Sequence, residues 1–169
     1  MTCKILLADY DQRWPELFRR EADRIKAALG SRALSIEHIG STSVPGLAAK
    51  PVIDILLVVA NSADEGAYAP ALEEAGYKLT IREPEWHQHR MLQGAACDIN
   101  LHVFSSGCEE IGRVILFRDW LREHAEDRDL YAYKKSELAR QEWENVQNYA
   151  DAKTAVVAQI LERALQARA

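Results

Sequence analysis

Three features are scarce or missing in this chain: cysteine, a long apolar run and an excess of basic residues. Cysteine occurs only at Cys3, Cys97 and Cys108, with no Cys-x-x-Cys pair, so the sequence predicts neither a disulfide framework nor a structural zinc site. No run approaches the roughly 18 apolar residues of a membrane span, and the apolar stretch near the N-terminus is too short for a signal peptide. These absences predict a soluble, reduced, cytoplasmic protein with no membrane partner.

The charge balance narrows the range of partners. The 21 basic and 26 acidic residues give a formal net charge of −5, and the pI is near 5.6. Nucleic-acid-binding domains normally have a basic surface, so the sequence carries no strong nucleic-acid signal. A local basic pocket for phosphates is still compatible with this charge, and no protein partner is indicated.

Length and periodicity predict one α+β domain over 1–169. Apolar residues recur at helical spacing over 14–29, and the apolar, β-branched run 52–59 is typical of a central buried strand. Further strands are predicted at 33–39, 77–82, 90–93 and 97–104, and further helices at 44–49, at 63–75 after a Ser62 cap, and at 109–123, 127–141 and 147–166. The prediction is a small mixed sheet flanked by helices over about 1–105, then a C-terminal helical set over about 106–169.

Polar residues interrupt two of the predicted strands. Asp54 lies inside the apolar run 52–59, where a carboxylate needs a partner, so it is either half of a structural ion pair or a metal-binding or catalytic residue. Asp98, Asn100 and His102 share one face of strand 97–104 because side chains alternate along a strand. That face either contacts water or forms a polar wall beside Asp54, if the two strands are neighbours.

The turn Gly40-Ser41-Thr42-Ser43 is a candidate phosphate site. Small residues before a helix can present N–H groups and hydroxyls to a phosphate, although the same residues are also ordinary helix caps. Because Lys50 follows closely, we expect a phosphorylated ligand at this turn.

Three cations lie on the apolar stripes of the C-terminal helices: Arg118, Lys135 and Lys153. Their aliphatic stems either pack while the charges reach water, or the charges converge on the phosphate pocket, as we expect for cations on packing faces. Arg90 and His102 are expected companions. His102 would act as a general base or as a hydrogen-bond partner of the ligand.

The stretch 36–55, IEHIGSTSVPGLAAKPVIDI, resembles the signature of the GrpB family, a branch of the nucleotidyltransferase superfamily. The segments WP at 14–15, NLHVF at 100–104, LFRDWLR at 116–122 and YADAK at 149–153 match in the same order. The resemblance therefore covers nearly the whole chain. It implies a nucleotidyltransferase-like fold with added helices.

The resemblance also implies a magnesium site. Superfamily members carry Gly-Ser or Gly-Gly at a helix start, then Asp-x-Asp or Asp-x-Glu on the next strand and a third carboxylate nearby, which together hold Mg²⁺. Asp54 matches the first carboxylate, Leu56 stands where the second is expected, and Asp98 or Asn100 is the candidate third. We therefore expect Asp54 and Asp98 to be the metal ligands, and Asp54 and His102 to be the catalytic residues. The expected ligand-binding residues are Gly40, Ser41, Thr42, Ser43, Lys50, His38, Arg118, Lys135 and Lys153.

These residues leave three functional hypotheses. The first is a Mg²⁺-dependent protein that binds a nucleoside triphosphate or another phosphorylated ligand and transfers a nucleotidyl group to an unknown acceptor. The alternative is a noncatalytic nucleotide-binding or chaperone-like module that has lost the second carboxylate. The third is a transition-metal site of His87, His89 and His102, because His-x-His pairs occur in such sites.

Overall fold

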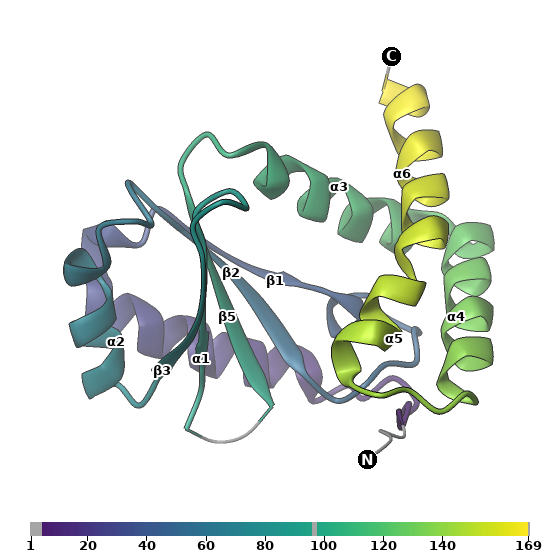
Figure 1. The fold of residues 1–169 in the computed structure, drawn as a ribbon, viewed down its shortest axis with the longest axis horizontal. Helices are drawn as coiled ribbons and strands as arrows, with labels where there is room; N and C mark the ends of the chain where they lie inside the picture. Colours follow the sequence, from purple (N-terminus) through teal and green to yellow (C-terminus); the bar gives the residue numbers. More distant parts are fainter. Residues whose placement is uncertain (1–4, 96–97, 169) are drawn as a thin grey trace.

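The computed structural model describes residues 5–95 and 98–168, so Cys3 and Cys97 lie outside the described residues. Within them the chain forms a five-stranded sheet in the order β1-β2-β5-β4-β3 (Figure 1). β2 and β5 pair in parallel, and the other neighbouring strands pair antiparallel. The strands are β1 (Ser35–Ile39), β2 (Ile53–Val59), β3 (Lys78–Glu83), β4 (His89–Gln93) and β5 (Ile99–Ser105). The predicted mixed α+β fold is confirmed.

Helices cover both faces of this sheet. α1 and α2 pack against one face, α3 packs against the opposite face, and α4, α5 and α6 gather beside one end of the sheet (Figure 1). The helices are α1 (Trp14–Leu29), α2 (Ala69–Glu74), α3 (Glu109–Glu123), α4 (Ala125–Ala139), α5 (Val146–Ala152) and α6 (Thr154–Arg168). None of the helices in the described part of the chain is long and apolar enough to span a membrane.

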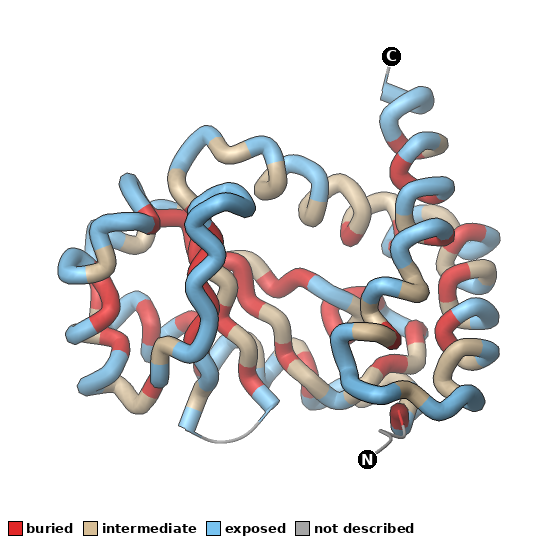
Figure 2. The backbone as a smooth tube through the Cα atoms, in the orientation of Figure 1, coloured by how far each residue is buried: buried red, intermediate tan, exposed pale blue. Residues whose placement is uncertain are grey.

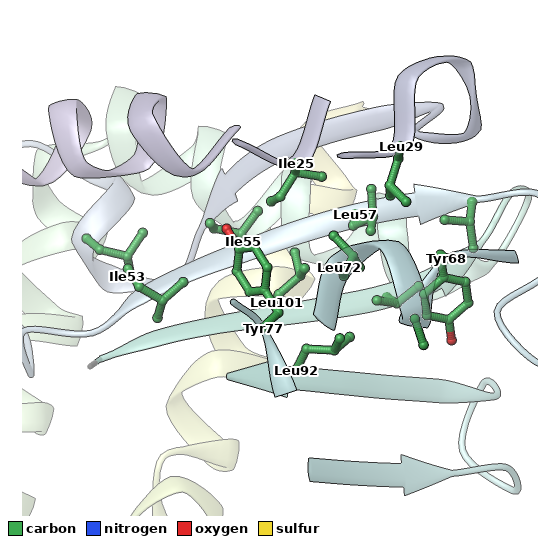
Figure 3. Packing of buried hydrophobic residues seen from close by; sticks show 14 of the residues in the cluster. Ile25, Leu29, Ile53, Ile55, Leu57, Tyr68, Leu72, Tyr77, Leu92 and Leu101 are labelled. Atoms are coloured by element: carbon green, nitrogen blue, oxygen red, sulfur yellow. The ribbon is translucent and has the colours of Figure 1, made fainter. Parts of the chain in front are cut away.

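Alternate residues of β2 and β5 supply two separate apolar clusters. Ile55, Leu57 and Leu101 join Ile25 of α1 and Leu72 of α2 in the main core, where these side chains point toward one another (Figure 3). On the other face of the same strands, Leu56, Val58 and Phe104 contact α3 in a smaller cluster. The central strands are therefore buried from both sides and are largely red in Figure 2.

The helix predicted at 44–49 does not form, and that prediction is wrong. A 3₁₀ turn at Ser41–Ser43 precedes the segment and ends at Val44, which is extended. Within the segment, Gly46 has a left-handed backbone with φ +84°. Ala49 then pairs with Ala8 in an isolated antiparallel bridge. A left-handed residue followed by an extended one cannot continue a helix.

Two other predicted helices differ from the observed ones. The segment 63–75 contains only a 3₁₀ turn at Glu65–Ala67 followed by α2, and Ser62 does not cap it, since its hydroxyl donates to the Gln88 carbonyl at 2.7 Å. The single helix predicted at 147–166 is two helices, α5 and α6, which meet at Lys153. The amide of Asn148 donates to the Asn145 side chain, which caps α5.

Candidate functional site

Two cavities lie along the sheet face that carries Asp54, and both are lined by Ser41, Asp54, His102 and Lys153. We call them the apolar cavity, of about 360 Å³, and the lysine cavity, of about 400 Å³. The apolar cavity is also lined by Ile39, Gly40, Val44, Glu110, Arg113, Val114, Phe117, Arg118, Leu121, Tyr131, Val157 and Leu161. The lysine cavity is also lined by Thr42, Ala49, Lys50, Val52, Ile81, Met91, Asn100, Lys135, Val146, Gln147, Tyr149 and Ala150.

Asp54 is the one residue of β2 that is not fully buried. The sheet register places it beside Ile39 of β1 and Asn100 of β5. Its Oδ1 lies 3.1 Å from the Nε2 of His102, which donates the hydrogen bond. A Cβ atom on Gly40, which has φ +75°, would lie 2.7 Å from Asp54 Oδ2. Glycine is therefore needed at this position both for its backbone conformation and for the close approach of the carboxylate.

The lysine cavity brings together Lys50, Lys135 and Lys153. Lys135 is almost fully buried and donates to the Ala48 carbonyl at 2.7 Å. Burial lowers the pKa of Lys135 to about 7, and the charge of Lys153 adds to this effect. Burial, followed by the charge of Lys50, also lowers the pKa of Lys153, while Asp54 opposes the shift. Three lysine side chains therefore meet at this cavity, and burial disfavours the charged forms of Lys135 and Lys153.

Two tyrosines belong to these cavities although they were not predicted as site residues. The Tyr149 hydroxyl is buried without a hydrogen-bond partner among the described residues, and burial raises its pKa. Tyr131 is also buried, which raises its pKa to about 12, and a hydrogen bond with Ser41 opposes the rise. The signal in the sequence was their position on the helical stripes that also carry Lys135 and Lys153.

The turn 40–43 lies at the cavities, but two of its hydroxyl groups donate hydrogen bonds to backbone carbonyls of the protein itself. The Ser43 hydroxyl donates to the Gly40 carbonyl at 2.5 Å, and the Thr42 hydroxyl donates to the Val52 carbonyl at 3.0 Å. Ser41 lines both cavities, whereas Ser43 lines neither. Ser41 is thus the serine of this turn that is placed to contact a ligand.

Two predicted site residues lie elsewhere. The ring of His38 is stacked on Phe18 of α1, on the opposite face of the sheet, with its Nε2 3.0 Å from the Thr42 hydroxyl. Burial lowers the pKa of His38 to about 4. Asp98 precedes β5 with a left-handed φ of +56° and lines a separate cavity beside α1. The structure brings neither side chain into the two cavities, so the pairing of Asp98 with Asp54 is corrected.

Of the two predicted arginines, Arg118 shares a cavity with Lys153 and Arg90 does not. Arg118 lines the apolar cavity, where its guanidinium donates to Glu37 at 2.7 Å. Arg90 points away from both cavities and donates to Glu65 at 2.7 Å. The structure therefore places Arg118 with Lys153 at the apolar cavity, Lys135 with Lys153 at the lysine cavity, and Arg90 at neither.

The three histidines of the transition-metal hypothesis do not converge. His89 Nε2 lies 3.0 Å from His102 Nδ1, and His89 Nδ1 lies 2.7 Å from Glu83. His87 lies in the exposed turn between β3 and β4, against the Trp86 ring. Ring nitrogens that bond to one another leave no shared point for an ion, and no group of three metal-ligating side chains occurs among the described residues.

The cavities offer few of the oxygen donors that the implied magnesium site needs. Mg²⁺ prefers oxygen ligands in near-octahedral geometry. Two carboxylates line the cavities, Asp54 and Glu110, and Glu110 pairs with Arg113 at 3.3 Å. Leu56 occupies the second position, and Asn100 stands directly opposite Asp54. The described residues therefore do not fit a Mg²⁺ ion held by the protein's own side chains.

The sheet order and its flanking helices define a nucleotidyltransferase-like fold. The structure matches that of Cid1 poly(U) polymerase with Mg and 3′-dATP bound at a TM-score of 0.55. The match covers 78% of this chain and 44% of that chain at 11% identity, so it shows the fold alone. The predicted fold is confirmed.

The sequence comparisons then identify the family. The profile described as GrpB protein matches residues 4–163. The chain is 60% identical over 160 residues to a UPF0157 protein of Halalkalibacterium halodurans, covering 95% of this chain and 82% of the relative. The crystal structure of conserved protein GrpB from Enterococcus faecalis matches at a TM-score of 0.83 and 31% identity, covering 96% of this chain and 99% of that chain. The protein belongs to the GrpB family.

Proposed function

We propose that the protein binds a small phosphorylated molecule, such as a nucleoside phosphate, with its anionic group in the lysine cavity. The observation that carries this proposal is that two lysine side chains at the cavity have no hydrogen-bond or ion-pair partner in the part of the chain that the structure describes. The ammonium groups of Lys50 and Lys153 make no hydrogen bond and no ion pair with any described residue. The ammonium group of Lys153 lies 4.7 Å from the centre of the Tyr149 ring. An anion between the lysines would relieve their mutual repulsion and give both ammonium groups hydrogen-bond acceptors.

The adjoining apolar cavity supports a ligand with two chemically different parts. Val44, Phe117 and Leu121 form much of its wall, while Ser41 and Lys153 belong to both cavities. A molecule that spans the shared boundary would place a phosphate near the lysines and an apolar or aromatic group against α3. Such cavities with a few convergent polar groups are typical of small-molecule sites.

The test measures binding of AMP, ATP and pyrophosphate to the full chain by titration calorimetry. We expect Lys50→Met and Lys153→Met each to weaken binding about 10- to 100-fold, because a charge-assisted hydrogen bond contributes about 1.5–3 kcal/mol. Lys134→Met is the matched control, since Lys134 pairs with Glu137 on the exposed side of α4. Unchanged affinity in both lysine variants, or equal loss in the control, contradicts the proposal.

The magnesium dependence is a separate arm of the same experiment. Since the cavity donors do not fit a protein-held Mg²⁺ ion, we expect AMP to bind equally well with Mg²⁺ and with a chelator. AMP is the suitable probe because a monophosphate is less dependent on Mg²⁺ for charge neutralisation than a triphosphate. A gain in AMP affinity with Mg²⁺ that is lost in Asp54→Asn would contradict the metal-free proposal.

Nucleotidyl transfer is the second candidate function. It is supported by Asp54 and by Gly40-Ser41, which stand at the family positions described above, and opposed by Leu56 at the second carboxylate position. Incubation with α-labelled ATP and Mg²⁺ distinguishes the two candidates. Transfer of label by the wild type but not by Asp54→Asn supports an enzyme, whereas binding without transfer supports the noncatalytic ligand-binding protein.

A further inference from the structure

A chain of four polar side chains crosses the sheet face at the two cavities. His102 Nε2 lies 3.1 Å from Asp54 Oδ1, His102 Nδ1 lies 3.0 Å from His89 Nε2, and His89 Nδ1 lies 2.7 Å from Glu83 Oε1. These residues come from β2, β5, β4 and β3, which are consecutive neighbours in the sheet. Glu83 and His89 are directly opposed in the register of β3 and β4. The chain therefore connects the carboxylate at the cavities with a half-exposed carboxylate at the sheet edge.

The number of protons in this chain follows from its geometry. Each of the three contacts needs one proton between its two heavy atoms, because two facing lone pairs at 2.7–3.1 Å repel each other. Ionised carboxylates supply none, and each neutral imidazole supplies one. Two neutral histidines therefore account for two contacts, and the third requires one additional proton.

We propose that Glu83, His89 and His102 form a proton relay that positions Asp54, with one imidazolium shared by the two histidines. The proposal deepens the proposed function, since Asp54 and His102 line both cavities of the ligand site. The relay gives Asp54 a cationic partner from the protein itself at the place where the resemblance implied a metal ion. Glu83 and His89 are positioning residues in this arrangement, because neither lines the two cavities.

The proton distribution within the relay is set by the surroundings of each ring. Transfer of the central proton between His89 and His102 converts one complete arrangement into the other. His89 is buried between the rings of Trp86 and Phe104, and this burial lowers its pKa. Glu83 opposes that shift, and the charges of His102 and Arg90 add to it. The His102 side chain is 23% exposed and the His89 side chain 6%, so a charge costs less on His102, beside Asp54, and His89 is the neutral tautomer that donates through Nδ1 to Glu83.

This charge placement has a consequence for the ligand. An imidazolium on His102 adds a further cationic group to the lysine cavity, which also holds Lys50, Lys135 and Lys153. Asp54, with Oδ1 engaged by His102 and Oδ2 against Gly40, is held in one orientation. An anionic ligand then encounters a preorganised site, which reduces the cost of binding.

The decisive experiment is ¹⁵N NMR of the histidines in the ligand-free full chain at about pH 6.5, the ordinary pKa of histidine. We expect His102 to carry protons on both ring nitrogens, His89 to carry one on Nδ1, and a scalar coupling to connect the two rings. Addition of Mg²⁺ leaves these signals unchanged. Two neutral rings without coupling, or a His102 signal that moves with Mg²⁺, would overturn the relay.

Matched variants separate the relay from general effects of the hairpin. Glu83→Gln removes the terminal charge, and we expect the His102 ring to lose its second proton at the same pH. Glu85→Gln is the control, since Glu85 lies two residues away in the same exposed turn. With AMP as the probe, we expect Glu83→Gln to bind about 3- to 10-fold more weakly than the wild type. Glu85→Gln should keep the wild-type affinity. An unchanged His102 signal in Glu83→Gln overturns the relay.

The two proposals fail independently in these measurements. Histidine signals of the free protein report on the relay even if no phosphorylated probe binds. Conversely, a relay that is absent while Lys50→Met and Lys153→Met still weaken AMP binding leaves the ligand-binding proposal intact.

Discussion

The two faces of the central strands are built from alternate residues of the same segments, yet they have different chemistry. On one face, Leu101 and Val103 of β5 join the main core beneath α1 and α2. On the other, Asn100 and His102 lie beside Asp54 at the cavities. Adjacent residues of a strand therefore have different surroundings, because successive side chains point in opposite directions.

The site is recognisable as an exception to the usual composition of a buried parallel strand pair. A parallel pair covered by helices on both sides normally carries apolar residues on both faces. The main-core face of β2 follows this rule, with Ile53, Ile55 and Leu57 all buried. The face toward α3 follows it at Leu56 and departs from it at Asp54. The departure from the apolar pattern lies at the proposed ligand site, while the residues that follow the pattern form the core.

Adjacent positions on β5 provide the largest expected contrast between the faces. We expect Leu101→Ala to lower the free energy of unfolding by about 2–5 kcal/mol, because it leaves a cavity in the main core. Asn100→Ala should change it by about 0.5 kcal/mol or less, since Asn100 lies at the lysine cavity. Urea denaturation of both variants gives the two values. Equal losses would show that the two faces contribute alike to stability.

The burial of His38 on the core face makes the free energy of unfolding depend on pH. Because burial holds its folded pKa at about 4, the unfolded chain, with a pKa near 6.5, takes up the proton first as the pH falls. Relative to His38→Gln, the wild type should lose about 3 kcal/mol of stability between pH 6.5 and 4 and none above that range. Urea denaturation across this range measures the difference. His87→Gln serves as the control because His87 is exposed, and its free energy of unfolding should depend on pH as in the wild type. If the free energies of unfolding of the wild type and His38→Gln change in parallel with pH, His38 is not a buried neutral ring.

Gly40 and Gly46 together test how tightly the backbone packs against Asp54 on the cavity side. Both have left-handed backbones, with φ +75° and +84°, but a Cβ would meet Asp54 only at Gly40. We expect Gly40→Ala to be about 1–2 kcal/mol less stable than Gly46→Ala, because both variants share the backbone strain and only one adds the clash. Gly40→Ala should also shift the His102 ring signals. Equal destabilisation with unchanged His102 signals would mean that the approach of Gly40 to Asp54 is not tight.

The residues explain why some predictions were correct. α1 and α3 occupy 14–29 and 109–123, as predicted, because their boundaries depend on local signals. The strand at 52–59 was recognisable from its apolar composition, and Asp54 from interrupting it. The helix at 44–49 was wrong because the left-handed Gly46 and the bridge between Ala49 and Ala8 are decided by the surrounding fold.

Four features could be predicted from the sequence alone: the family, the α+β class, the strand that carries Asp54, and the polar alternation at Asn100 and His102. These are local or pattern properties, and the side-chain periods of helices and strands make them readable. The tertiary structure decided which polar residues meet. It turned His38 toward α1, placed Asp98 in a separate cavity and linked Glu83 through His89 to His102. Those outcomes depend on strand order and register, which join segments that are distant along the chain.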